Sequence, residues 1–85
     1  MATADTISRK LIAALRPDEI DVQDVSHQHA GHAGWREGGG THFEITMKAA
    51  VFAGKSRIEK HRMVNTILAE DLASSVHALQ LHLSD

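Results

Sequence analysis

A glycine-rich stretch in the first half of the chain most constrains its fold. Residues 27–40 read HQHAGHAGWREGGG and contain five glycines and three histidines. Glycine adopts backbone conformations that other residues avoid and weakens helices and strands, so a regular element is not expected here. The sequence therefore predicts a long mobile loop over residues 27–40, and loops longer than about 12 residues in compact domains often carry function.

The segments on either side of this loop alternate as β-strands do. Over residues 19–26, Ile20 and Val22 alternate with polar residues, and from Phe43 to Ala49 every second residue is apolar. Successive side chains of a strand point to opposite faces, so the alternation predicts two strands that each have one buried face. We expect these strands to pair as an antiparallel hairpin around the loop.

The first segment of the chain has the spacing of a helix. Within residues 3–16, Ile7, Leu11 and Leu15 recur every four residues, and Pro17 follows. This spacing places the three side chains on one apolar stripe, and proline ends a helix because it lacks a backbone N–H group. The sequence therefore predicts a helix that buries this stripe.

A second helix is predicted to begin at Ser56 and to end near Ser74. The Ser-Arg-Ile-Glu sequence that begins there is a capping box, in which the Ser56 hydroxyl and the Glu59 carboxylate each bind an amide of the other residue. The last segment, residues 76–83, alternates again and places His77 on the apolar face. The order α-β-β-α-β predicts an α+β fold with helices on one face of a three-stranded sheet.

The length of the chain allows one domain, which we place over residues 1–85. The absence of cysteine excludes disulfides, thiolate ligands and thiol nucleophiles from the chain itself. A secreted domain this small usually carries disulfides, so we expect a cytoplasmic location, with an organelle matrix as the alternative. No segment has the roughly 20 apolar residues that span a bilayer. The formal net charge of −2 argues against strong non-specific binding to nucleic acid.

Histidine is unusually abundant, with seven residues in a chain of 85. It is the commonest metal ligand, and it titrates near neutral pH. His27, His29 and His32 lie close together in the loop and could bind one metal ion, although a solvated loop without that role is the alternative. For His77, the simpler expectation is a partly buried imidazole that forms a hydrogen bond with the backbone.

Several ordered motifs resemble those of the BolA family over nearly the whole chain. They are Ser26-x-x-His29, Thr41-His42-Phe43, Phe52-x-Gly54, Lys60-His61-Arg62-Met63-Val64, Leu68-Ala69-Glu70-Asp71-Leu72 and Val76-His77-Ala78-Leu79. The usual helix motif of that family is Arg-His-Arg, and Lys60 replaces its first arginine, which keeps the charge but loses the bidentate guanidinium. The resemblance implies a KH-like (BolA-like) fold, with an extra helical turn before the long helix.

The resemblance also implies a function, that of an adaptor in iron–sulfur cluster assembly, trafficking or regulation. In that family the BolA-like protein forms a heterodimer with a monothiol glutaredoxin. Glutaredoxin and glutathione supply thiolates to a [2Fe-2S] cluster that the two proteins share. The BolA-like chain supplies histidines, which correspond here to His77 and, in a histidine-loop subgroup, to His29. His32 is the main rival because the repeated His-Ala-Gly spacing lets the loop alignment shift, and His27 comes third. The isolated chain is expected to be a monomer without a cluster.

A DNA-binding transcriptional regulator is the alternative function. Arg57, Lys60, His61 and Arg62 form a basic stripe on the predicted second helix, which could contact DNA or a protein partner. KH-like folds can bind nucleic acid. A free-standing zinc or copper site on the loop histidines is a further alternative. The sequence has no nucleophile elbow or phosphate-binding loop before a helix, so no enzymatic activity is expected.

Overall fold

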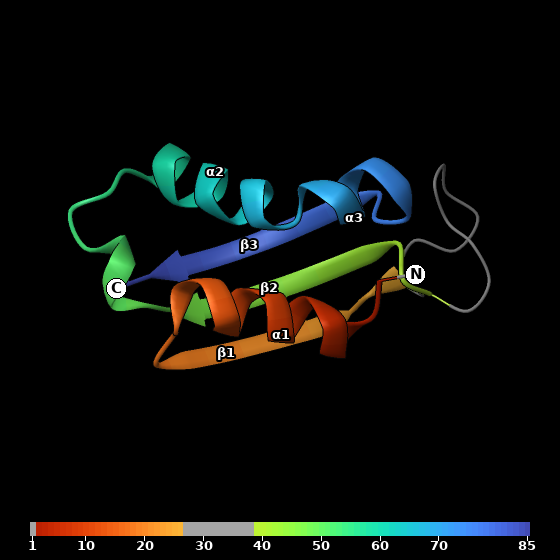
Figure 1. Ribbon diagram of the computed structural model, residues 1–85, viewed down its shortest axis with the longest axis horizontal. Coiled ribbons are helices and arrows are strands. Elements are labelled where there is room, and N and C mark those ends of the chain that lie inside the picture. The colour runs from red at the N-terminus through yellow and green to blue at the C-terminus, as the bar shows by residue number, and fades with distance from the viewer. Residues whose placement is uncertain (1, 27–38) are drawn as a thin grey trace.

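The computed structural model describes residues 2–26 and 39–85. Its elements in chain order are helix α1 (Ala4–Leu15), strands β1 (Glu19–Asp24) and β2 (His42–Lys48), the short 3-10 helix η2 (Ala50–Phe52), helices α2 (Arg57–Ile67) and α3 (Ala69–Ser74), and strand β3 (Ala78–Ser84), as Figure 1 shows. This order confirms the predicted α-β-β-α-β arrangement, with the second helix in two parts. η2 occupies the place of the extra helical turn that the resemblance implied.

β2 is the central strand of a three-stranded mixed sheet with the order β1-β2-β3. β1 pairs antiparallel with β2, with Glu19 opposite Lys48, so the predicted hairpin is confirmed. β3 pairs parallel with β2, from His42 opposite Ala78 to Lys48 opposite Ser84. Because α1 packs against β1, and α2 contacts both α1 and β3, the helices lie together on one face of the sheet (Figure 1).

The hydrophobic core lies between that face and the helices. The predicted stripe of α1 is confirmed, since Ile7, Leu11 and Leu15 are all buried. Burial of one large aliphatic side chain contributes about 1.5–3 kcal/mol, so this stripe is a main reason why α1 docks on the sheet. The central strand and the inner face of the second helical region supply the other large buried side chains, among them Phe43, Ile45, Met47, Val64 and Leu68.

The sequence predicted one continuous helix from Ser56 to near Ser74, but the structure has two helices here. α2 ends at Ile67, Leu68 adopts φ −99° and ψ 16°, and α3 begins at Ala69 without a side-chain cap. The Leu68 N–H still donates to the carbonyl of Val64 at 3.0 Å, and the Leu68 side chain is buried. Apolar spacing indicates only which side chains are buried. Because Leu68 stays buried, the spacing does not reveal the change in backbone conformation at this residue.

The last strand begins later than predicted. β3 starts at Ala78 rather than at Val76. Val76 is buried and His77 is exposed, so the predicted position of His77 on the apolar face of the strand is wrong. The chain joins the sheet at this point, because the N–H groups of His77 and Ala78 both donate to the carbonyl of Thr41, at 2.6 and 3.2 Å. Alternation therefore applies only from Ala78 onward.

Among the described residues, glycines with positive φ lie at the end of the predicted loop and in the turn after η2. Gly39 and Gly40 have φ values of 80° and 79°, in keeping with the predicted loop, whose remaining residues 27–38 lie outside the described part of the chain. Gly54, with φ 75°, makes the turn after η2. Phe52 ends η2 and is buried. None of the described helices has the length and apolar character needed to cross a bilayer.

Candidate functional site

A partly buried hydrogen-bond cluster joins the end of β1 to the beginning of β2. The Ser26 hydroxyl accepts the N–H groups of Thr41 and His42, each at 3.1 Å, and donates to Asp24 Oδ1 at 2.5 Å. Asp24 Oδ2 accepts the Gly40 N–H at 2.8 Å, while Oδ1 also accepts the Ser26 N–H at 2.9 Å. We call these five residues the Ser26 cluster. They hold together the backbone on both sides of residues 27–38.

His77 lies directly against this cluster. Its N–H donates to the Thr41 carbonyl at 2.6 Å, and its imidazole is exposed. The His42 imidazole is only 4% exposed, and its Nδ1 lies 2.8 Å from Thr41 Oγ1. The two imidazole centroids are 5.2 Å apart, with an angle of 52° between the planes. One buried imidazole therefore packs beside one accessible imidazole at the start of β3.

The predicted loop ligands His29 and His32, together with His27, lie outside the described residues. Within residues 2–26 and 39–85, no three side chains of His, Asp or Glu come close enough together to hold a metal ion. A metal bound at His77 would therefore need ligands from residues 27–38, from another molecule, or from both. His77 itself can supply one nitrogen ligand.

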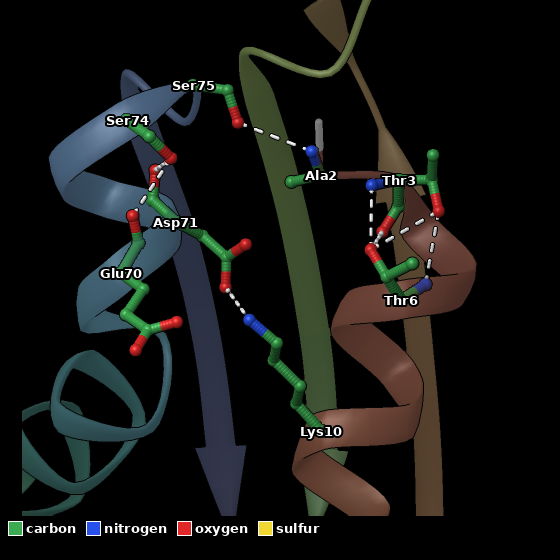
Figure 2. A network of polar contacts seen from close by, with 8 residues as sticks. All are labelled: Ala2, Thr3, Thr6, Lys10, Glu70, Asp71, Ser74 and Ser75. Carbon is green, nitrogen blue, oxygen red and sulfur yellow. Dashed lines mark hydrogen bonds and ion pairs between the residues drawn. The ribbon is translucent and has the colours of Figure 1, made fainter.

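A second network, drawn in Figure 2, fixes the segment that leads into His77. The Lys10 ammonium of α1 donates to Asp71 Oδ2 of α3 at 2.7 Å, and the Ala2 N–H donates to Ser75 Oγ at 3.3 Å (Figure 2). The Asp71 carboxylate raises the pKa of Lys10 through this hydrogen bond and through its charge. The Asp71 carbonyl also accepts the N–H of Val76 at 2.8 Å. The N-terminal helix is thus bound to the residues that immediately precede His77.

The basic stripe lies at the opposite end of β3. Arg57, Lys60 and His61 of α2 line a groove of about 360 Å³, and the rest of its lining comes from Leu81, His82 and Leu83 of β3. Arg62, the fourth member of the predicted stripe, is exposed and does not line the groove. Leu81, the groove residue nearest to His77 along β3, follows it by four residues, which at about 3.3 Å per residue is roughly 13 Å along the strand. The histidine site and the groove are therefore separate surfaces.

Sequence reasoning missed the structural role of the Ser26 cluster. Asp24-Val25-Ser26 has the pattern of an Asx turn, in which an Asp side chain accepts the N–H two residues further on, and Asp24 does so here. That local signal was present in the sequence. The hydrogen bonds between Ser26 and Thr41 could not be predicted in the same way, because they join residues that lie far apart in the sequence. The groove was missed for the same reason, since only the packing of α2 beside β3 brings its walls together.

Comparisons with known proteins give one consistent family. The family described as "BolA-like protein" matches residues 11–85. Curated relatives include the DNA-binding transcriptional regulator BolA of Escherichia coli strain K12, which is 37% identical over 96% of this chain and 74% of that protein. SufE-like protein 1 of Arabidopsis thaliana, named as chloroplastic/mitochondrial, is 42% identical over 88% of this chain, which corresponds to only 21% of that longer protein.

Solved structures agree with this grouping. The BolA domain of SufE1 from Arabidopsis thaliana superposes with a TM-score of 0.87 at 36% identity and covers 99% of this chain and 93% of that one. BolA1 from the same plant gives a TM-score of 0.84 at 35% identity, with coverage of 99% and 92%. The predicted fold class is therefore confirmed both by the topology of the chain and by the structures that it resembles.

Proposed function

This chain belongs to the BolA-like protein family, and from that premise we propose that it is a non-enzymatic adaptor for iron–sulfur clusters. In this proposal it pairs with a monothiol glutaredoxin and supplies histidine ligands to a [2Fe-2S] cluster that bridges the two proteins. Glutaredoxin and glutathione supply the thiolates. The observation that carries the proposal is the position of His77, an exposed imidazole on a backbone fixed by the carbonyl of Thr41.

The donor set of the chain fits such a shared site. The chain contains no cysteine, so any thiolate must come from a partner or from glutathione. An exposed imidazole on a fixed backbone can meet a cluster presented by a second protein, because few degrees of freedom are lost on binding. The second ligand is His29 or its rival His32, and the Ser26 cluster holds the backbone that flanks residues 27–38 beside His77.

Histidine ligation would give the shared cluster properties that thiolate ligation does not. In Rieske centres, replacement of two thiolates by two imidazoles on one iron raises the reduction potential. Imidazole binds a metal only when its ligating nitrogen is deprotonated, so protons compete with the metal for it. A cluster held partly by His77 is therefore expected to be transferred more readily than one held only by thiolates.

The test is anaerobic reconstitution of the full chain with a monothiol glutaredoxin, glutathione, iron and sulfide, followed by visible circular dichroism. We expect His77→Ala to change the cluster spectrum or to prevent the mixed complex from retaining its cluster. Gln80→Ala is the control, because Gln80 is also exposed on β3 but does not line the groove. A His77→Ala spectrum identical to that of the unmodified complex would refute the assignment, while His29→Ala and His32→Ala distinguish the two loop candidates.

DNA binding is the second candidate function. Two relatives carry that name, from Escherichia coli and Vibrio cholerae, and α2 presents Arg57, Lys60, His61 and Arg62. We place it second because only Arg57, Lys60 and His61 line a common groove and because the whole chain is negatively charged. Titration of fluorescent duplex DNA at several salt concentrations tests this function, since phosphate contacts make affinity fall steeply with salt.

A further inference from the structure

The outer edge of β3 has backbone groups that face away from the sheet. The Ala78 N–H donates to the carbonyl of Thr41, which precedes β2, and the Ser84 carbonyl accepts the N–H of Ala49, which follows β2. In a parallel pair the residues of a strand direct their N–H and C=O groups alternately toward and away from the partner strand. Residues 78, 80, 82 and 84 therefore face β2, and Leu79, Leu81 and Leu83 direct theirs outward. None of the other described strands lies at that edge.

The groove described above runs along this edge. Its floor is formed by Leu81, His82 and Leu83, which are consecutive residues of β3. Consecutive side chains of a strand point to opposite faces, so a groove lined by three in a row must follow the strand edge rather than one face of the sheet. The outward backbone groups of Leu81 and Leu83 consequently lie in the groove.

The wall opposite the strand edge is basic. It consists of Arg57, Lys60 and His61, whose spacing places them on one face of α2. The Glu44 carboxylate contacts one groove residue, since it binds His82 Nε2 at 2.9 Å. The groove thus combines open strand hydrogen-bonding groups with a concentration of positive charge, on a chain whose net charge is −2.

We propose that this groove binds an extended acidic peptide segment of a partner protein, which adds as a strand to the outer edge of β3. The peptide backbone pairs with the N–H and C=O groups of Leu81 and Leu83. Every second peptide side chain then points toward α2, where a carboxylate meets Arg57 or Lys60. Such strand addition takes affinity from main-chain hydrogen bonds and specificity from alternate side chains.

A peptide fits this groove better than a nucleic acid does. Single-stranded nucleic acids bind through aromatic stacking platforms combined with a long basic track. The groove has two permanently charged side chains, Arg57 and Lys60, and no Phe, Tyr or Trp. A second copy of this chain could pair its own acidic edge strand β1 with β3. Such a contact joins two different surfaces of the chain, so it would produce open-ended assemblies unless the rotation between subunits closes a ring.

The experiment uses the full chain and a blocked eight-residue peptide that alternates glutamate and threonine. We expect the amide resonances of Leu81 and Leu83 to shift and their hydrogen exchange to slow when the peptide is added, because their N–H groups gain acceptors. The amides of Gln80 and His82 are internal controls, since they already face β2. Peptides with glutamine in place of glutamate, or with a central proline that removes one N–H donor, should bind about tenfold more weakly.

A double variant tests the basic wall. Arg57→Gln with Lys60→Gln should weaken binding of the glutamate peptide by about tenfold. Arg9→Gln in α1 with Arg16→Gln at its C-cap removes the same charge and should leave binding unchanged. Binding without slowed exchange at Leu81 and Leu83 would overturn strand addition. Slowing of those amides by higher protein concentration alone would assign the edge to a second copy. Tighter binding of an octathymidylate at the same ionic strength would assign the groove to nucleic acid.

Discussion

Substitution of Ser26 by alanine tests whether the Ser26 cluster holds the site together. The side chain is 1% exposed, and its hydroxyl is the acceptor for the buried N–H groups of Thr41 and His42. Ser26→Ala removes that acceptor and leaves a space too small for ordinary solvation. A buried amide that loses its partner costs about 1–3 kcal/mol, so two such amides predict a loss of about 2–6 kcal/mol.

This loss is large compared with the stability of a small domain, which is about 5–15 kcal/mol. For a chain of this size, each kcal/mol lowers Tm by about 4–8 °C, so the fall in Tm is at least roughly 8 °C, which thermal unfolding followed by far-UV circular dichroism would detect and urea unfolding would confirm. Ser74→Ala is the control, because the Ser74 hydroxyl donates to the Glu70 carbonyl on an exposed helix surface. Its free energy of unfolding should change by less than about 0.5 kcal/mol.

Hydrogen exchange locates the effect of Ser26→Ala within the molecule. The Thr41 and His42 amides should exchange faster than in the unmodified chain, relative to strand amides remote from the cluster. If the free energy of unfolding changes by less than about 0.5 kcal/mol and these amides keep their protection, the hydroxyl is not their essential acceptor. The reasoning that assigns the cluster its structural role would then be refuted.

Two further predictions concern the glycines and the capping box. Gly39→Ala should destabilise the chain by about 1 kcal/mol more than Gly54→Ala does, as measured by urea unfolding. Both glycines have positive φ, but only at Gly39 would the added Cβ lie 2.5 Å from Asp24 Oδ2. Equal losses of stability would contradict this prediction. Hydrogen bonds from the backbone and hydroxyl of Ser56 lower the pKa of Glu59. Its ionised form therefore stabilises the fold above the ordinary pKa of 4.5, and this contribution disappears as the pH falls through the lower folded pKa. Glu59→Gln should thus be less stable than the unmodified chain at pH 7, with a difference that vanishes in acid; a constant difference would contradict the assignment.

The parts of the fold that depend on local pattern could be predicted from the sequence. The stripe of Ile7, Leu11 and Leu15 required only helical spacing, and burial of all three followed. The capping box at Ser56 was equally local, and both of its hydrogen bonds are present. The break at Leu68 could not be predicted, since no proline or glycine marks it. The Leu68 side chain is buried in the observed pair of helices, as it would be in one continuous helix.

The candidate sites depended on contacts between distant segments, so the sequence predicted them less completely. It singled out His77 but placed it on a strand face, because alternation cannot show where a chain joins a sheet. It grouped Arg57, Lys60 and His61 by their helix but could not place the edge of β3 opposite them. The contribution of His29 and His32 stays a prediction, since both lie outside the described residues.

The positions of the two chain ends bear on how the protein should be labelled for experiments. The hydrogen bond from Ala2 to Ser75 places the N-terminal end two residues before His77, whereas the C-terminal end lies at the far end of the sheet (Figure 1). An N-terminal oligohistidine tag would therefore add foreign imidazoles beside the proposed metal ligand. A C-terminal tag would instead emerge just beyond Leu83, beside the groove. Each surface is best studied with the affinity tag on the opposite terminus.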